Sequence, residues 1–150
     1  MKLTVSKLNN FLLFKLPSAF FCGVRVKEID VNKCVVSVKH RWINQNPFNS
    51  MYFAVQAMAA ELSTGALVMF QIAKSGRKIS MLVANNKGNF TKKATGRITF
   101  TYNDGHLIEK AILETIATGE GQTFWMKSIG TNETGIQVSE MDFEWSVRVK

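Results

Sequence analysis

One carboxylate, Glu61, lies in the middle of the most apolar stretch of the chain, which runs from Ser50 to Ile72. Burying an ionisable group there costs free energy unless the group is paired or has a task, and such groups cluster at functional sites. Desolvation raises the pKa of a carboxyl group, which suits a base that activates water. We interpret Glu61 as the candidate catalytic base. The alternative is a structural glutamate that is satisfied by backbone groups or by an arginine across a dimer interface.

Small residues surround Glu61 on the face that it would share in a helix. They are Ala54, Ala57, Thr64 and Gly65, at helical spacings of three, four and seven residues. This pattern predicts an open strip beside the helix, as a substrate tunnel would require. Thr64, one turn after Glu61, is a candidate for orienting the attacking water; the alternative is a small packing residue that bonds to its own helix.

The apolar stretch predicts a buried helix, over about residues 50–72, rather than a membrane span. Its length alone would allow a span, but it contains Gln56, Glu61, Ser63, Thr64 and Gln71. A helix that is apolar on nearly all faces is more simply enclosed by the rest of a globular fold. The segment Asn46–Ser50 is typical of a turn with an N-cap, which predicts the start of this helix.

Size and composition predict one folded domain over residues 1–150, because 46% of the residues are apolar and 20% are charged. No secretory signal pattern is visible. Cys22 and Cys34 form no metal or redox motif, so we expect reduced thiols in a cytoplasmic protein, with a disulfide or a reactive thiol as the alternatives. No group of residues has metal-ligand spacing.

The remaining segments predict an antiparallel sheet curled around the buried helix, which is an α+β architecture. Residues 141–149 are the clearest strand, because apolar and polar side chains alternate throughout. Before the long helix we expect a helix over about 6–16 and strands over 24–29 and 34–42. After it we expect strands over 78–84, 97–102, 122–129 and 136–149, a bend or bulge over 85–89 and a helix over 106–117.

The net charge is +8 and the pI is about 9.7, which favours anionic partners. Cations concentrate in one third of the chain, at Lys74, Arg77, Lys78, Lys87, Lys92, Lys93 and Arg97. A phosphorylated small molecule such as coenzyme A would suit these charges, and the alternative is a solvated surface face. Nucleic acid is disfavoured because no binding motif accompanies the charge.

The order of elements and the residues before the long helix resemble the hotdog-fold thioesterases, most closely the phenylacetate-pathway (PaaI-type) branch and its uncharacterised relatives. That branch carries an Asn, a Gly three residues on, His-Gly-Gly three residues further, and an acid nine residues after the His. Asn46, Asn49, the run Tyr52-Phe53-Ala54, and Glu61 stand at these positions with the same spacing. The His and all three glycines are therefore replaced, while the segment Lys92–Arg97 resembles the one that leads into the next family strand.

The resemblance implies a hotdog fold and a homodimer or dimer of dimers, in which Glu61 of one chain meets Asn46 of the other. It implies hydrolysis of an acyl or aryl thioester of coenzyme A, without a cofactor or a metal. Glu61 would activate water, and Asn46 would hold that water or the thioester carbonyl. The amide of Phe53, at the start of the helix, would form an oxyanion hole.

The substrate is expected to contact further residues: Tyr52 as a pocket wall, Ser80 as a polar partner, and Lys92, Lys93 and Arg97 as partners of coenzyme A. The alternative function is a non-catalytic hotdog protein that binds an acyl or aromatic ligand. In that case Tyr52 and Phe53 would close the catalytic mouth.

Overall fold

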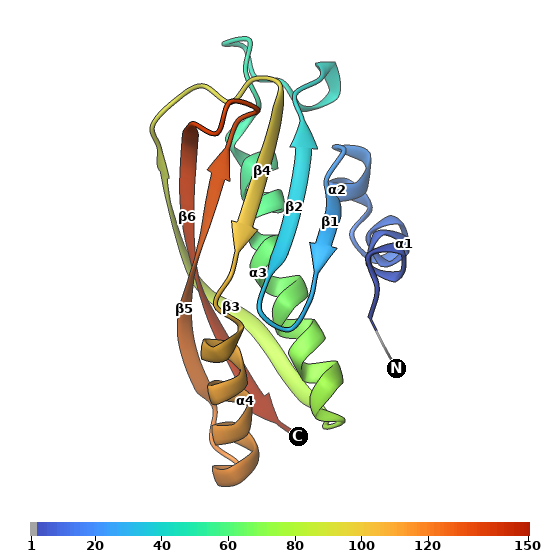
Figure 1. Ribbon diagram of the computed structural model, residues 1–150, viewed down its shortest axis with the longest axis vertical. Helices are drawn as coiled ribbons and strands as arrows, with labels where there is room; N and C mark the ends of the chain where they lie inside the picture. Colours follow the sequence, from blue (N-terminus) through green and yellow to red (C-terminus); the bar gives the residue numbers. More distant parts are fainter. Residues whose placement is uncertain (1–2) are drawn as a thin grey trace.

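The helix that carries Glu61, α3 (Phe53–Ser75), is the axis around which the rest of the chain curls (Figure 1). The computed structural model describes residues 3–150. The helix begins and ends three residues later than predicted. The expected N-cap within Asn46–Ser50 is wrong, because the N-cap is Tyr52 and its side chain makes no capping hydrogen bond. Residues before it form an irregular loop instead.

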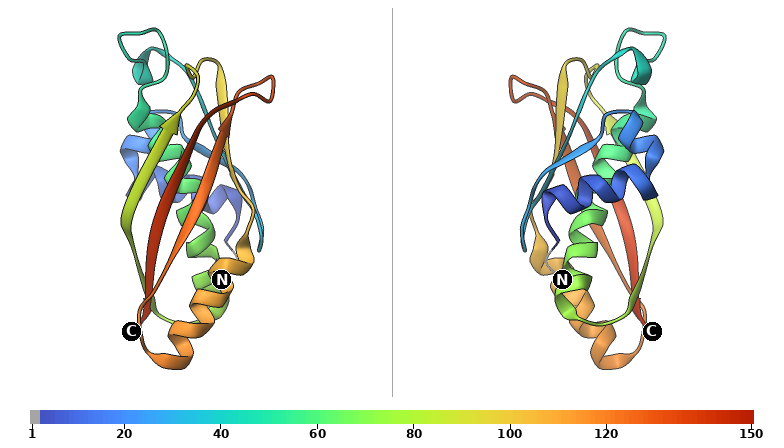
Figure 2. Two further views of the ribbon diagram at one scale, coloured as in Figure 1. Left: turned by 90° about the vertical axis from the view of Figure 1, so that its left-hand side faces the viewer. Right: turned by 90° about the vertical axis from the view of Figure 1, so that its right-hand side faces the viewer.

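Six antiparallel strands form one sheet in the order β1-β2-β4-β5-β6-β3. Both α1 and α2 lie beside α3 on the open side of the sheet, and α4 lies at the lower end (Figures 1 and 2). The remaining elements are α1 (Val5–Lys15), α2 (Pro17–Phe21), β1 (Arg25–Ile29), β2 (Cys34–Lys39), the 3-10 turn η1 (Trp42–Asn44), β3 (Ile79–Phe90), β4 (Arg97–Tyr102), α4 (Gly105–Thr118), β5 (Gln122–Thr131) and β6 (Gln137–Val149).

The predicted alternation decides which face of the sheet meets α3. Val36 and Val38 of β2, and Ile98 and Phe100 of β4, are fully buried in the core. Their chain neighbours project from the other face, because side chains alternate along a strand. The predicted α+β architecture, with a sheet wrapped around a buried helix, is therefore confirmed.

Polar residues of α3 are buried because the sheet supplies their hydrogen-bond partners. Ser63 shares a hydrogen bond of 2.7 Å with Ser128 of β5, and Gln56 accepts one of 2.8 Å from Ser139 of β6. Of the helices in residues 3–150, α3 is the one whose length and composition would allow it to cross a membrane, yet most of its apolar window is buried inside the fold.

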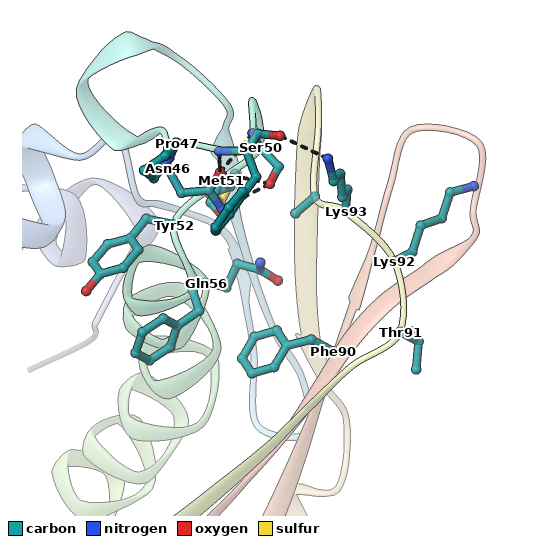
Figure 3. A pocket seen from close by; sticks show the side chains of 13 residues that line it. Asn46, Pro47, Ser50, Met51, Tyr52, Gln56, Phe90, Thr91, Lys92 and Lys93 are labelled. Atoms are coloured by element: carbon teal, nitrogen blue, oxygen red, sulfur yellow. Dashed lines mark hydrogen bonds between the residues drawn. The ribbon is translucent and has the colours of Figure 1, made fainter.

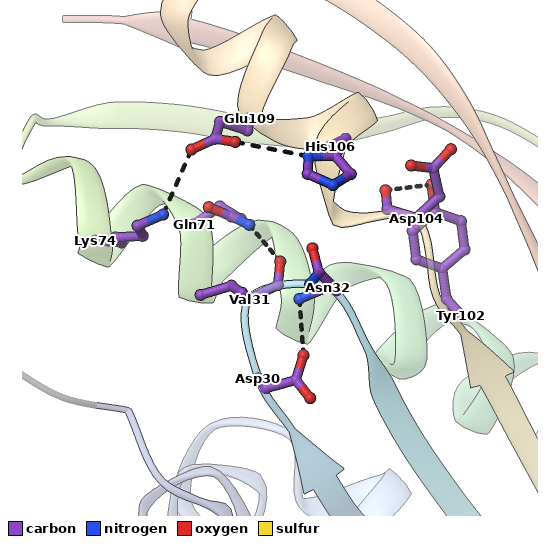
Figure 4. Close-up of polar contacts among 9 residues, drawn as sticks. All are labelled: Asp30, Val31, Asn32, Gln71, Lys74, Tyr102, Asp104, His106 and Glu109. Atoms are coloured by element: carbon purple, nitrogen blue, oxygen red, sulfur yellow. Dashed lines mark hydrogen bonds and ion pairs between the residues drawn. The ribbon is translucent and has the colours of Figure 1, made fainter.

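The lower end of the molecule is tied together by contacts from α3 (Figure 4). The Gln71 amide donates to the carbonyl of Val31 in the β1–β2 turn. Lys74 pairs with Glu109 of α4 at 3.4 Å. These contacts hold the carboxyl half of α3 against two other elements, and they leave its amino end as the more open part.

Two predicted strand boundaries are wrong, each for a physical reason. The predicted bend or bulge over 85–89 is part of β3, which pairs with β6 as far as Phe90 and bulges just before this range, at Ala84, because the long partner strand outweighs the turn signals. The predicted strand 34–42 ends at Lys39, because Asn44 donates to the carbonyl of Lys39 and holds η1. The short helix α2 was not predicted; it begins at Pro17, whose missing N–H costs nothing at the first helical position.

Candidate functional site

A cavity of about 540 Å³ opens at the amino end of α3 (Figure 3). Its walls come from the loop 46–52, the first turn of α3, and the segment 90–94 that follows β3. The volume lies within the range of about 300–1,000 Å³ that is usual for small-molecule sites. This part of the molecule therefore has the size and position of a ligand site.

Three aromatic rings form one wall of the cavity. The ring of Phe53 lies 5.1 Å from that of Tyr52 and 6.2 Å from that of Phe90, both edge to face. All three side chains remain about half exposed. The wall suits an apolar or aromatic group, as expected for Tyr52 and Phe53. The contribution of Phe90 was missed, because the sequence placed the end of its strand too early.

The start of α3, beside this wall, leaves backbone amides without intrahelical acceptors. The first residues of an α-helix have no intrahelical acceptor for their N–H groups, and here these residues are Phe53 and Ala54. The N–H of Tyr52, by contrast, donates to the carbonyl of Asn44 at 2.9 Å. A helix start that offers free N–H groups stabilises negative charge, which is the property that an oxyanion hole needs.

Asn46 organises the loop before the helix. Its side-chain oxygen accepts from the backbone N–H of Phe48 at 2.9 Å and of Ser50 at 3.2 Å, and its amide donates to the Ser50 hydroxyl at 3.0 Å. Asn49 has a φ of 57°, in the left-handed region. Asparagine adopts this conformation more readily than other non-glycine residues, which explains how it replaces the glycine of the resembling family.

The structure separates the three basic residues that were predicted to bind coenzyme A. Lys92 and Lys93 line the cavity, and Lys93 donates to the carbonyl of Phe48 at 3.1 Å (Figure 3). Arg97 lies instead in a second cavity, which shares no lining residue with the first. Ser80 lies near the opposite end of the sheet, where its exposed hydroxyl donates to the carbonyl of Arg148.

Gln56 is a cavity residue that sequence reasoning missed. It is 4% exposed, and its side-chain oxygen accepts from Ser139 at 2.8 Å. Its amide nitrogen has no hydrogen-bond partner among residues 3–150, although the residue lines the cavity. Its spacing of three residues from Phe53 places it on the face of the first helical turn that lines the cavity, and that was the available signal.

Glu61 lies two turns further along α3, beside a separate cavity of about 110 Å³. The neighbours there are the apolar side chains of Leu12, Leu16 and Met58, together with Ser18, Ala19 and Leu62. No cation or hydrogen-bond donor of residues 3–150 pairs with its carboxylate. Burial raises the pKa of Glu61 from 4.5 to about 7. The carboxyl group of Glu61 therefore titrates much closer to neutral pH than an exposed glutamate does.

The strip next to Glu61 is filled further along the helix, which corrects the prediction of an open strip. Thr64 is fully buried; its hydroxyl donates to the carbonyl of Glu61 at 2.8 Å and accepts from the indole N–H of Trp145 at 2.9 Å. A Cβ on Gly65 would lie 2.9 Å from the Trp145 ring. Only the Ala54 and Ala57 side of the strip stays partly open.

A single chain therefore supplies two halves of a site that do not meet. Asn46, Tyr52 and Phe53 belong to the cavity at the amino end of α3, whereas Glu61 faces another cavity. Among the described residues, no three His, Cys, Asp or Glu side chains are grouped so that they could hold a metal ion. What the described chain offers is a carboxyl group, helix amides and an aromatic wall.

Solved structures define the class of fold. One similar structure is a "probable thioesterase" from Pseudomonas aeruginosa, with 22% sequence identity, coverage of 100% of this chain and 99% of that chain, and a TM-score of 0.82. A protein of unknown function from Chlorobaculum tepidum has 12% identity, coverage of 99% of both chains and a TM-score of 0.85. A thioesterase from Haemophilus influenzae has 12% identity, coverage of 99% of this chain and 93% of that chain, and a TM-score of 0.76. The fold is the hotdog fold, so the predicted fold is confirmed.

Within that class, residues 6–147 match the family described as a domain of unknown function, DUF4442. The chain belongs to this family. No curated protein matches the chain.

Proposed function

We propose that this protein hydrolyses acyl or aryl thioesters of coenzyme A, with Glu61 as the base that activates water. The observation that carries the proposal is the unpaired carboxyl group of Glu61, whose pKa burial raises to about 7. A base works best when its pKa is close to the operating pH. Two solved relatives of the same fold bear the name thioesterase, one of them as "probable", which supports the reaction class.

The remaining parts of the reaction follow from the cavity at the amino end of α3. The amides of Phe53 and Ala54 would stabilise the oxyanion that forms when water attacks the thioester carbonyl. Lys92 and Lys93 would attract the phosphates of coenzyme A. Asn46 would hold the loop, and with it the carbonyl, in position. Thr64 would act as a positioning residue, because its hydroxyl bonds to the carbonyl of Glu61.

We further propose that the protein acts in the cytoplasm and that it forms a homodimer. The homodimer is proposed because the two halves of the site lie apart in one chain. The edge strand β3 is 12 residues long and exposes Leu82 at 67%, and a long exposed edge invites pairing with another chain. The adjacent face of α3 carries the half-buried Ala54, Ala57, Met58 and Glu61. Pairing of two such faces about a two-fold axis would bring Glu61 toward the Asn46 loop of its partner.

The test is turnover of a panel of acyl- and aryl-CoA thioesters, with the released thiol as the readout. Glu61→Gln keeps the shape of the side chain and removes the base. We expect kcat to fall by about 10²–10⁴-fold, as is usual when a general base is lost. Because the base must be ionised, kcat/KM of the unchanged protein should rise with pH through about 7.

Glu120→Gln is the matched control, since it makes the same chemical change at an exposed position after α4. It should leave turnover unchanged. Equal activity of the unchanged protein and Glu61→Gln would show that Glu61 is not the base.

A second function is favoured by one observation, the aromatic wall of Tyr52, Phe53 and Phe90 across the cavity. Rings placed there suit a non-catalytic protein that binds an acyl or aromatic ligand. Binding of a CoA thioester by calorimetry, without thiol release from either the unchanged protein or Glu61→Gln, would select this function over hydrolysis.

A further inference from the structure

A second cavity, of about 260 Å³, lies at the upper ends of β1, β2 and β4. Every side chain that lines it carries a positive charge: Arg25, Lys27, Lys39, Arg41 and Arg97, with Gly23 as the remaining residue. None of these five cations forms an ion pair with a carboxylate of residues 3–150. The nearby Glu133 accepts a hydrogen bond from the backbone N–H of Arg97 at 2.7 Å rather than pairing with its guanidinium.

The strand register forces two of these charges together. Lys39 and Arg97 stand directly opposite each other in the β2–β4 ladder. Their chain neighbours Val38 and Ile98 are fully buried against α3, so Lys39 and Arg97 project from the outer face of the sheet. Like charges placed directly opposite destabilise a sheet. No carboxylate of residues 3–150 forms an ion pair with either side chain, so a bound anion would relieve the repulsion between them.

One of the arginines, Arg25, is held in place before any ligand arrives, and a second, Arg41, lies close to it. Arg25 donates to the carbonyls of Phe20 at 2.8 Å and Val24 at 2.7 Å, and its guanidinium stacks 3.6 Å from the centre of the Phe20 ring. Arg41 lies against Gly23, where a Cβ would come within 2.5 Å of its Nη2 atom. Burial, and then the charge of Arg41, lower the pKa of Arg25. The two guanidinium groups therefore sit close enough to repel each other.

We propose that this cavity binds a compact anion with adjacent phosphate groups, a di- or triphosphate chain. One guanidinium group can donate two parallel hydrogen bonds to two oxygens of a phosphate group, and the ammonium groups of the lysines add further positive charge. The volume is below the range of about 300–1,000 Å³ for drug-sized ligands, so the phosphate chain, rather than a larger attached group, is what the cavity holds. The site is separate from the cavity at the amino end of α3, and the proposal does not depend on thioester hydrolysis.

Inorganic tripolyphosphate is the probe, and its binding is measured by calorimetry at about 50 and about 200 mM NaCl, where binding should weaken as salt rises. The double variant Lys27→Gln/Lys39→Gln should bind at least about tenfold more weakly, because two direct charge contacts are lost. Lys27→Arg/Lys39→Arg keeps both charges and should bind within about threefold of the unchanged protein.

The matched control is Lys78→Gln/Lys110→Gln, which makes the same change in net charge at exposed positions near the lower end of the molecule. It should bind tripolyphosphate within about twofold of the unchanged protein. Thermal unfolding checks that Lys27→Gln/Lys39→Gln folds, and its Tm should be equal or higher, because the repulsion between positions 39 and 97 is gone.

A second titration uses ATP in place of tripolyphosphate. Equal affinity for both indicates that the phosphate chain of a nucleotide is accepted, and preference for tripolyphosphate indicates an inorganic ligand. The proposal is overturned if tripolyphosphate does not bind at millimolar concentration, or if the control loses as much affinity as Lys27→Gln/Lys39→Gln. Binding of mixed-sequence duplex DNA through Lys27 and Lys39, without binding of tripolyphosphate, would overturn it in favour of a nucleic-acid surface.

Discussion

At the scale of single residues, the proposed chemistry depends on the surroundings of one carboxyl group. Glu61 contacts apolar side chains of α1 and its own helix, and no cation of the described chain compensates its charge. Burial alone therefore raises its pKa to about 7. The same desolvation that makes Glu61 a suitable base destabilises the folded chain whenever the carboxylate is ionised.

This trade-off predicts a pH-dependent stability. The pKa of Glu61 is about 7 in the folded chain and 4.5 in the unfolded chain, so the folded chain binds more protons between these values and loses stability as pH rises through them. The loss amounts to about 3 kcal/mol. Glu61→Gln carries no charge, so its stability relative to the unchanged protein should increase by about 3 kcal/mol between about pH 4 and about pH 8.

Urea unfolding at both pH values measures this difference. Glu120→Gln, at an exposed position, should show no comparable change between the two pH values. A constant difference between Glu61→Gln and the unchanged protein across the whole range would mean that Glu61 is not desolvated.

At the scale of elements, α3 is held by side chains that fit the sheet closely. The indole of Trp145 in β6 fills the space that the missing side chain of Gly65 leaves, and it donates to Thr64. Glycine within a helix costs about 1 kcal/mol relative to alanine. This glycine is therefore explained by packing rather than by helix formation.

Gly65→Ala should destabilise the protein, although alanine favours a helix. The new Cβ would lie 2.9 Å from the Trp145 ring and 3.1 Å from a carboxylate oxygen of Glu61. Overpacking of this kind costs about 1–3 kcal/mol, and thermal unfolding should show a lower Tm.

The control is the same substitution in a Trp145→Phe background, where the smaller ring leaves room for the methyl group. Gly65→Ala should cost less there, and the difference between the two backgrounds gives the coupling energy. Equal costs in both would mean that the Trp145 ring does not limit position 65.

At the scale of the whole molecule, the proposed homodimer would bring together the two halves of the proposed site. Glu61 and the Asn46 loop lie at different cavities of one chain. The exposed edge of β3 and the half-buried face of α3 are the surfaces through which a second chain would complete the site. A dimer of this kind would hold two equivalent sites.

Complementation between two inactive variants tests this arrangement. Glu61→Gln and Asn46→Ala should each be nearly inactive alone. After mixing and subunit exchange, half of the dimers are mixed, and each mixed dimer has one site with both residues intact. We therefore expect about a quarter of the original turnover to return.

Sedimentation of each variant confirms that both still form dimers. If turnover does not recover in a mixture that is shown to exchange subunits, Glu61 and Asn46 do not meet across the dimer interface. They then either act together within one chain or do not form a shared site.

The sequence by itself determined a sheet wrapped around a buried helix, because the alternation in residues 34–38, 97–102 and 141–149 and the nearly uniform apolarity around Glu61 are local patterns that specify faces. The hotdog fold followed from the resemblance of the element order and of the residues before the helix to that family. It also pointed to a long buried helix, although it placed both ends three residues too early, and to a candidate base at Glu61. These features depend on residue type and spacing alone.

Only the tertiary structure decided which of these residues share a cavity. It carried β3 through the predicted bend, because β6 supplied a partner for the whole strand, and it filled the space beside Thr64 and Gly65 with Trp145. It separated Arg97 from Lys92 and Lys93, and joined it to Lys39 and to arginines more than fifty residues away. Pairing across strands is non-local, so residue spacing along the chain does not reveal it.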